Sequence, residues 1–142
     1  MPLSSKVSVI LLDIEGTTTP IDFVYETLFP FAREQMEAFL NANFDSPTLS
    51  ETLTLIQKDH AAERDPQVPA WENSSSGISR YLIWLMDQDR KATGLKAVQG
   101  LIWKAGYASG ELKATLYDDV APAIQRWTDS GLRVCIYSSG SI

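Results

Sequence analysis

The chain has 142 residues, of which 44% are hydrophobic and 21% are charged, enough for one domain-sized hydrophobic core. The formal net charge of −6 argues against a bulk nucleic-acid binder and against docking on anionic membranes. The single cysteine excludes an intramolecular disulfide, and the sequence has neither a secretory signal nor an apolar run of membrane-spanning length. These features predict a cytoplasmic protein, with the nucleus as an alternative location in a eukaryote.

The first predicted strand covers residues 7–12, an apolar and partly β-branched run that is typical of a buried parallel strand. Asp13 and Glu15 follow it directly, at the edge where open α/β sheets bind their ligands. Residues two apart on an extended chain point to the same face, so both carboxylates can converge on one ligand. Gly16 then permits a sharp turn. The alternative is that Asp13 only caps this turn and Glu15 is structural.

Helical periodicity dominates residues 21–112. It predicts four helices, whereas a simple crossover between parallel strands usually needs only one. Pro30 marks a start or a kink in the first helix, and Ser46 with Pro47 opens the second. The stretches are 23–40, 47–60, 74–85 and 95–107, with 64–73 as a loop. We interpret the block as a helical cap inserted after the first strand.

A fifth helix and a second buried strand close the chain. Asp118 or Asp119 is expected to cap the helix, Gly131 to end it, and residues 132–137 to form the strand. Ser138 and Ser139 then bring hydroxyl groups to the carboxyl end of that strand, which suits a phosphate oxygen. The alternative is an ordinary turn in which these serines cap a helix.

The two strand ends together indicate phosphoryl chemistry. Asp13 is the predicted nucleophile, because attack by its carboxylate on phosphorus splits hydrolysis into two easier steps. Glu15 is the predicted general acid and base. Phosphoryl transfer depends mainly on positioning and charge neutralisation, so we expect Mg²⁺ at Asp13 and Glu15. Glu15 could reach the metal through its side chain or its backbone carbonyl. His60 is expected to be a packed residue, not a catalyst.

The chain resembles the haloacid-dehalogenase-type phosphatases, and among them the enolase-phosphatases (acireductone synthases) of methionine salvage. Most members of the wider group carry Asp-x-Asp where this chain has Asp13-x-Glu15, and the glutamate marks the enolase-phosphatase variant. Three segments carry the resemblance: 13–19 (DIEGTTT), 102–107 (IWKAGY) and 136–141 (IYSSGS).

The resemblance implies an α/β fold and a specific reaction. The fold would be a Rossmann-like phosphatase core, formed by residues 1–20 and 113–142, with the helical cap at 21–112. The reaction enolises 2,3-diketo-5-methylthiopentyl-1-phosphate and then removes its phosphate to give acireductone. Ser138 and Ser139 would bind that small phosphorylated substrate, and the family would be monomeric. No residue is identified as the base for enolisation.

The resemblance also implies catalytic groups beyond residue 142. Relatives continue for roughly another hundred residues, which carry a lysine and a further aspartate of the Mg²⁺ site. We therefore expect the chain to be a short form with an incomplete core and, by itself, little or no phosphatase activity, because charge neutralisation dominates phosphoryl transfer. The open sheet edge should also favour self-association. Two alternatives remain, namely a related phosphatase with another substrate and a non-catalytic fragment.

Overall fold

The structure is a computed structural model that describes residues 6–138. The described residues form two compact units. One unit contains residues 6–28 together with 113–138, and the other contains residues 29–112. In each unit, particular residues of the sequence explain where several helices begin or end.

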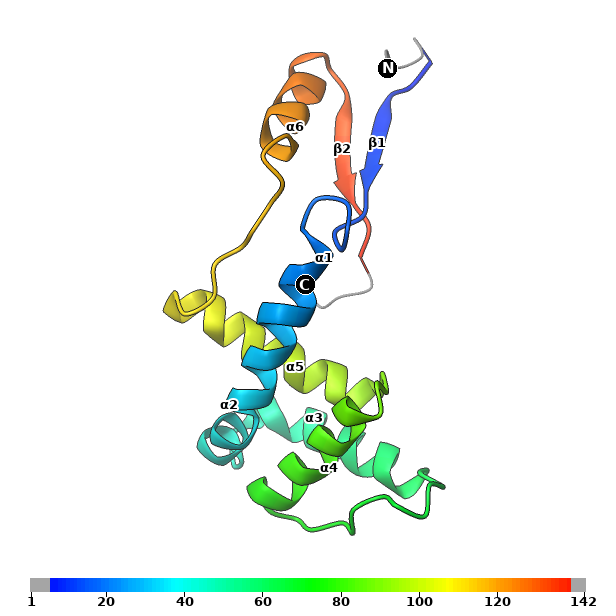
Figure 1. Ribbon diagram of the computed structural model, residues 1–142, viewed down its shortest axis with the longest axis vertical. Coiled ribbons are helices and arrows are strands. Elements are labelled where there is room, and N and C mark those ends of the chain that lie inside the picture. The colour runs from blue at the N-terminus through cyan, green and yellow to red at the C-terminus, as the bar shows by residue number, and fades with distance from the viewer. Residues whose placement is uncertain (1–5, 139–142) are drawn as a thin grey trace. The chain divides into compact units, whose positions relative to one another are not determined.

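The first unit is centred on two parallel strands, β1 (Val9–Leu12) and β2 (Arg133–Ile136) (Figure 1). Their register pairs Val9 with Arg133 at one end and Leu12 with Ile136 at the other. Helix α6 (Val120–Asp129) packs against β2. Both strands lie inside the predicted stretches, and the α/β fold class is confirmed.

Helix α6 begins differently from the way its sequence suggests but ends where the sequence predicts. Asp119 is its N-cap residue but has helical dihedral angles, and its carboxylate makes no capping hydrogen bond, so the predicted cap is wrong at Asp119. Gly131 follows the last turn with φ +81°, a left-handed conformation that glycine adopts without steric cost. Its N–H donates to the Thr128 carbonyl over 3.0 Å. The predicted end of the helix at Gly131 is thus confirmed.

One helical stretch runs without a gap through α1 (Ile21–Phe23), the π-helical turn η1 (Val24–Leu28) and α2 (Phe29–Asn43). Pro30 is the second residue of α2. Because proline has no N–H, it cannot donate to the carbonyl four residues earlier, and its ring crowds that carbonyl. The π-helical turn ends two residues before the proline and includes Glu26, the residue whose carbonyl the missing N–H would have bonded.

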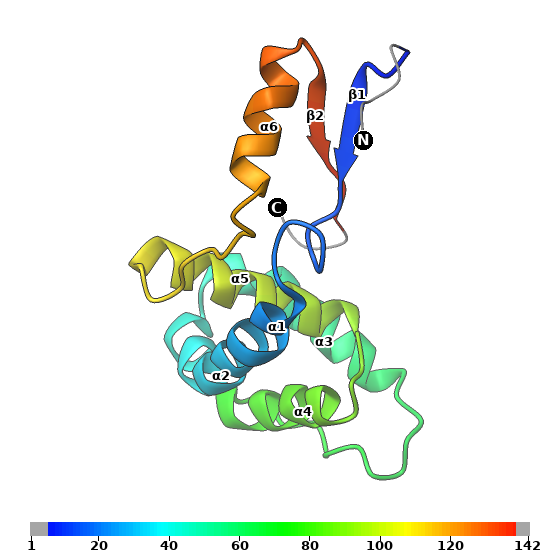
Figure 2. The same ribbon diagram turned by 45° about the horizontal axis from the view of Figure 1, so that its top comes forward.

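The second unit consists of α2 and three further helices, α3 (Pro47–Ala61), α4 (Ser75–Asp87) and α5 (Thr93–Ser109). Helix α5 packs against α2 and α3, and α4 packs against α2 (Figure 2). Two serines cap helices as N-cap residues: Ser46 Oγ accepts from Thr48 N, and Ser74 Oγ accepts from Gly77 N at 3.1 Å. The predicted start of the second helix at Ser46 is therefore confirmed.

Helix α5 receives its N-terminal cap from another helix. Its own N-cap residue, Ala92, has no side-chain acceptor, but Asp59 of α3 accepts from the Gly94 N–H over 2.8 Å. A carboxylate at this end also interacts favourably with the helix dipole. The pairing of α3 with α5 therefore supplies a polar contact in addition to apolar packing.

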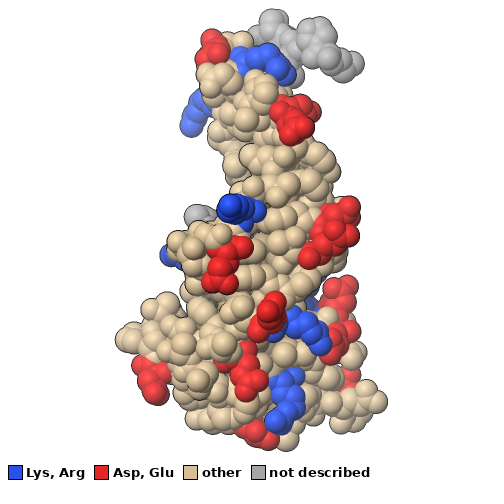
Figure 3. Space-filling view, turned by 60° about the vertical axis from the view of Figure 1, so that its left-hand side comes forward, with Lys and Arg blue, Asp and Glu red and all other residues tan. Residues whose placement is uncertain are grey.

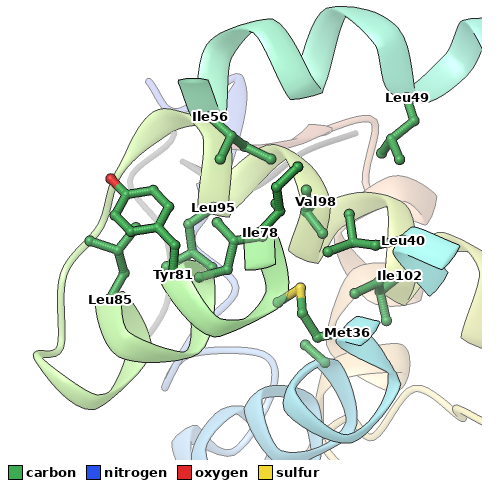
Figure 4. Packing of buried hydrophobic residues seen from close by; sticks show 12 residues of the cluster. Met36, Leu40, Leu49, Ile56, Ile78, Tyr81, Leu85, Leu95, Val98 and Ile102 are labelled. Atoms are coloured by element: carbon green, nitrogen blue, oxygen red, sulfur yellow. The ribbon is translucent and has the colours of Figure 1, made fainter. Parts of the chain in front are cut away.

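Apolar side chains from all four helices form the core of this unit (Figure 4). Residues from α2, α4 and α5 recur mostly at the three-to-four-residue spacing of an amphipathic helix, and the two from α3 are seven residues, or about two turns, apart. The buried cluster consists of Ala32, Met36 and Leu40 from α2, Leu49 and Ile56 from α3, Ile78, Tyr81, Leu82 and Leu85 from α4, and Leu95, Val98 and Ile102 from α5. The helical unit therefore has its own hydrophobic core.

His60 lies at the side of this core and holds the loop between α3 and α4. Its Nε2 is 2.7 Å from the Pro69 carbonyl oxygen, and its ring packs against Trp71 and Tyr81 at centroid distances of 5.3 and 4.8 Å. Burial, with the nearby charges of Glu63 and Asp59, raises the pKa of Tyr81 to about 12. His60 is thus a packed residue, as expected. Within residues 6–138, no helix combines the length and apolar character needed to cross a membrane.

Close packing at Gly94 leads to a stability prediction. A Cβ atom at this position would lie 2.7 Å from Ile56 Cγ1 and 2.8 Å from the Ile56 Cα and N atoms. Backbone atoms cannot rotate away, so Gly94→Ala should lower the free energy of unfolding by about 1–3 kcal/mol. Urea denaturation followed by circular dichroism measures this change.

Ser79→Ala is the matched control for Gly94→Ala, since it also changes a buried position on a helix. Among the described residues, the Ser79 hydroxyl is buried without a hydrogen-bond partner. Removing it should leave the stability unchanged or raise it. Equal stability of the Gly94→Ala variant and the parent would show that α3 and α5 are not packed as closely as described.

Candidate functional site

The candidate site lies in the loop that leaves the carboxyl end of β1. Asp13 and Glu15 both have exposed side chains there. The Ile14 carbonyl between them accepts from three backbone N–H groups, those of Thr17, Thr18 and Thr19, over 3.0–3.2 Å. This one acceptor holds the loop in a tight turn, with both carboxylates on solvent-accessible positions.

Gly16 makes the turn sterically feasible. Its φ is +76°, in the left-handed region, and its N–H donates to the Thr19 carbonyl over 2.8 Å. A Cβ atom at Gly16 would meet no atom within 4 Å. The requirement for glycine therefore comes from the backbone conformation and not from crowding, as the sequence predicts.

Thr18 makes hydrogen bonds within this loop and one to a segment that is distant in the sequence. It is buried, and its hydroxyl donates weakly to the Asp13 and Ile14 carbonyls at 3.4 and 3.3 Å. Its own carbonyl accepts from the Tyr117 N–H over 3.0 Å. Local turn bonding thus accounts for the Thr18 hydroxyl, and the segment before α6 is attached to the loop.

The carboxyl end of β2 lies beside the same loop. The Tyr137 N–H donates to the Leu12 carbonyl over 2.8 Å, one position past the last assigned pair of the ladder. Ser138 therefore follows at the edge of the sheet where Asp13 emerges. Ser139 lies outside the described residues. The structure brings Asp13, Glu15 and Ser138 to one edge of the sheet, while their chemical roles stay predictions.

The donor set at this edge fits a hard divalent cation. Among residues 6–138, no group of three or more His, Cys, Asp or Glu side chains is placed to hold a metal. Mg²⁺ is commonly bound by only one or two carboxylates, together with water and the phosphate oxygens of a substrate. Asp13 and Glu15 are the two carboxylates that would provide such oxygen ligands.

The hydrogen bond from the Tyr117 N–H to the Thr18 carbonyl could not be predicted from the sequence. Nothing in the composition or periodicity of residues 113–119 indicates a contact with a loop almost a hundred positions earlier. The contact uses backbone N–H and C=O groups, which every residue type except proline offers. No sequence pattern could therefore have identified it.

Comparisons with known proteins show which proteins this chain is similar to. No family model matches the chain. Enolase-phosphatase E1 of Synechococcus elongatus is 46% identical over 144 residues, which cover 100% of this chain and 60% of that protein. Enolase-phosphatase E1 of Drosophila willistoni is 44% identical over 153 residues, covering 99% of this chain and 58% of that protein. Across its whole length, this chain is homologous to the enolase-phosphatases.

A solved structure supports the same relationship. The crystal structure of the UTR4 protein from Saccharomyces cerevisiae matches with a TM-score of 0.68 and 33% identity, covering 96% of this chain and 53% of the yeast chain. The chain thus spans less than two thirds of the length of these enolase-phosphatases and of the yeast protein. The candidate site lies within the region that this chain shares with these proteins.

Charged side chains are mixed on the face of the described residues shown in Figure 3. Blue Lys and Arg groups are separated from one another by red Asp and Glu groups and by wide neutral areas. This face of the enolase-phosphatase homologue therefore offers no broad basic surface. A phosphate bound beside Asp13 would depend on local hydrogen-bond donors and a cation, because a protein of net charge −6 repels an anionic ligand at long range.

The left-handed Gly16 leads to a prediction about the loop. Gly16→Ala should cost about 1–2 kcal/mol of folding free energy, because an L-residue is disfavoured at this φ. Gly16→Asn is the matched control and should cost less, since asparagine tolerates the left-handed region. Thermal unfolding of both variants measures the difference. If alanine were no worse than asparagine, the turn would not hold Gly16 in the left-handed conformation.

Proposed function

We propose that this chain supplies catalytic groups of a Mg²⁺-dependent enolase-phosphatase. The substrate would be 2,3-diketo-5-methylthiopentyl-1-phosphate, and the products acireductone and inorganic phosphate. One observation carries the proposal: the parallel pairing of β1 and β2 brings Asp13, Glu15 and Ser138 to the same edge of a sheet. Homologues named enolase-phosphatase E1, at 46% and 44% identity, support it.

Asp13 would act as the nucleophile. Its carboxylate oxygen forms a bond to phosphorus while the bond from phosphorus to the organic oxygen breaks, which gives an aspartyl-phosphate. Glu15 would donate a proton to the leaving oxygen and then accept one from a water molecule. That water attacks phosphorus, releases phosphate and regenerates the Asp13 carboxylate. The exposed position of both side chains gives a substrate access to them.

Asp13 and Glu15 would also hold the metal ion. When bound, Mg²⁺ would reduce the repulsion between the Asp13 carboxylate and an anionic phosphate. The Ser138 hydroxyl would donate to a phosphate oxygen, and we assign the same role to Ser139. The fixed turn around the Ile14 carbonyl would keep the Asp13 backbone in place during both steps.

The nucleophile assignment is tested by Asp13→Asn in a protein that joins this chain to the remaining residues of an enolase-phosphatase relative. The change removes the attacking charge with little change in volume, so phosphate release should fall by about 10³-fold or more while the thermal unfolding temperature stays the same. Asp22→Asn, at an exposed acid of α1 in the same unit, is the matched control and should retain parental activity. Phosphate release within a few fold of the parent would refute the role of Asp13.

The metal assignment is tested by removal and return of the cation in the same protein. EDTA should stop turnover, and Mg²⁺ should restore it, because hard oxygen ligands suit this ion. Glu15→Gln should slow turnover, because it removes the proposed proton donor and acceptor. Its effect on the metal is therefore measured by direct Mg²⁺ binding, which weakens if the Glu15 side chain is a ligand and stays the same if the backbone carbonyl is the ligand. Full activity in metal-free buffer would contradict this use of the acid pair.

A further inference from the structure

Two exposed tyrosines lie beside the candidate site. Tyr117 is 44% exposed and Tyr137 is 72% exposed, although large aromatic side chains usually bury most of their surface. Neither belongs to the buried cluster of the helical unit. Both belong to the same compact unit as Asp13.

Backbone hydrogen bonds hold both tyrosines next to the nucleophile. The Tyr137 N–H donates over 2.8 Å to the carbonyl of Leu12, the residue directly before Asp13. The Tyr117 N–H donates over 3.0 Å to the carbonyl of Thr18, whose hydroxyl donates in turn to the Asp13 carbonyl. Each tyrosine is therefore fixed at its main chain to the strand or loop that presents Asp13, while its ring remains accessible.

We propose that Tyr117 and Tyr137 contact the organic part of the phosphorylated substrate and determine its specificity. The inference rests on the function proposed above. The carboxylates and Ser138 suit only the phosphate, so the rest of the substrate needs apolar contacts from other groups. Aromatic rings provide these contacts with few rotatable bonds, and they attract a thioether sulfur in particular. The ligand class is a phosphate ester with an apolar, sulfur-containing chain.

The competing explanation is that the rings are exposed only because this surface of the sheet is uncovered. Leu11 and Ile136, both 64% exposed, are apolar neighbours of the site as well. The two explanations differ in what a substitution does. A substrate contact changes KM for substrates that carry the apolar chain, whereas a merely exposed ring changes no kinetic parameter selectively.

The experiment compares Tyr117→Ala and Tyr137→Ala in the same joined protein that is used to test Asp13. The hydrogen bonds that hold the two tyrosines are donated by their backbone N–H groups, so an alanine at either position keeps these bonds and should keep the fold. Two substrates are used, the methylthio diketo phosphate and a shorter diketo phosphate without the methylthio end. We expect each variant to raise KM for the first by about tenfold, with kcat nearly unchanged, and to leave KM for the second unaltered.

Three controls separate the outcomes. Tyr117→Phe and Tyr137→Phe keep the ring and should restore the parental KM, and competitive inhibition by inorganic phosphate should be the same in all variants. Leu55→Ala truncates an exposed apolar side chain on α3 and should change nothing. Parental KM in both alanine variants, or an equal loss for both substrates, would overturn the inference. That result leaves the proposed function intact as long as Asp13→Asn is inactive, whereas an active Asp13→Asn variant refutes the function itself.

Discussion

The parallel pairing of β1 with β2 is the interaction on which the candidate site depends. It joins the first and last described segments of the chain, and its register aligns Leu12 with Ile136. The residues that follow these two positions are Asp13 on one strand and Tyr137 and Ser138 on the other. Without this pairing, the acidic and hydroxyl groups would lie on segments separated by the whole helical unit.

The helical unit is inserted in the sequence between β1 and β2, and it has a hydrophobic core of its own. Its four helices bury a continuous apolar cluster, and Asp59 adds a polar contact between α3 and α5. Because the helical unit is held together by its own contacts, its stability depends little on the two short strands that precede and follow it in the sequence. The chain leaves β1 for this unit by way of the π-helical turn before Pro30.

The loop after β1 shows how a few backbone groups can order the segment that carries the candidate site. One carbonyl, that of Ile14, satisfies three N–H groups, and the left-handed Gly16 closes the turn. Thr18 then uses its hydroxyl within the loop and its carbonyl toward Tyr117. The hydrogen bonds that hold this turn use neither the Asp13 nor the Glu15 carboxylate.

Sequence alone determined most of the helices and strands of this protein, whereas the chemistry of its acidic motif stays a prediction. Apolar periodicity predicted the strands and helices, Ser46 and Gly131 predicted a helix start and a helix end, and Gly16 predicted the turn, because these signals are local to the chain. Only the tertiary structure decided which elements pair, that Asp119 does not use its carboxylate as a cap, and that Tyr117 is attached to Thr18. These outcomes depend on backbone groups or on packing between distant segments. Every residue type carries nearly the same backbone, so no local pattern distinguishes the residues that make such contacts.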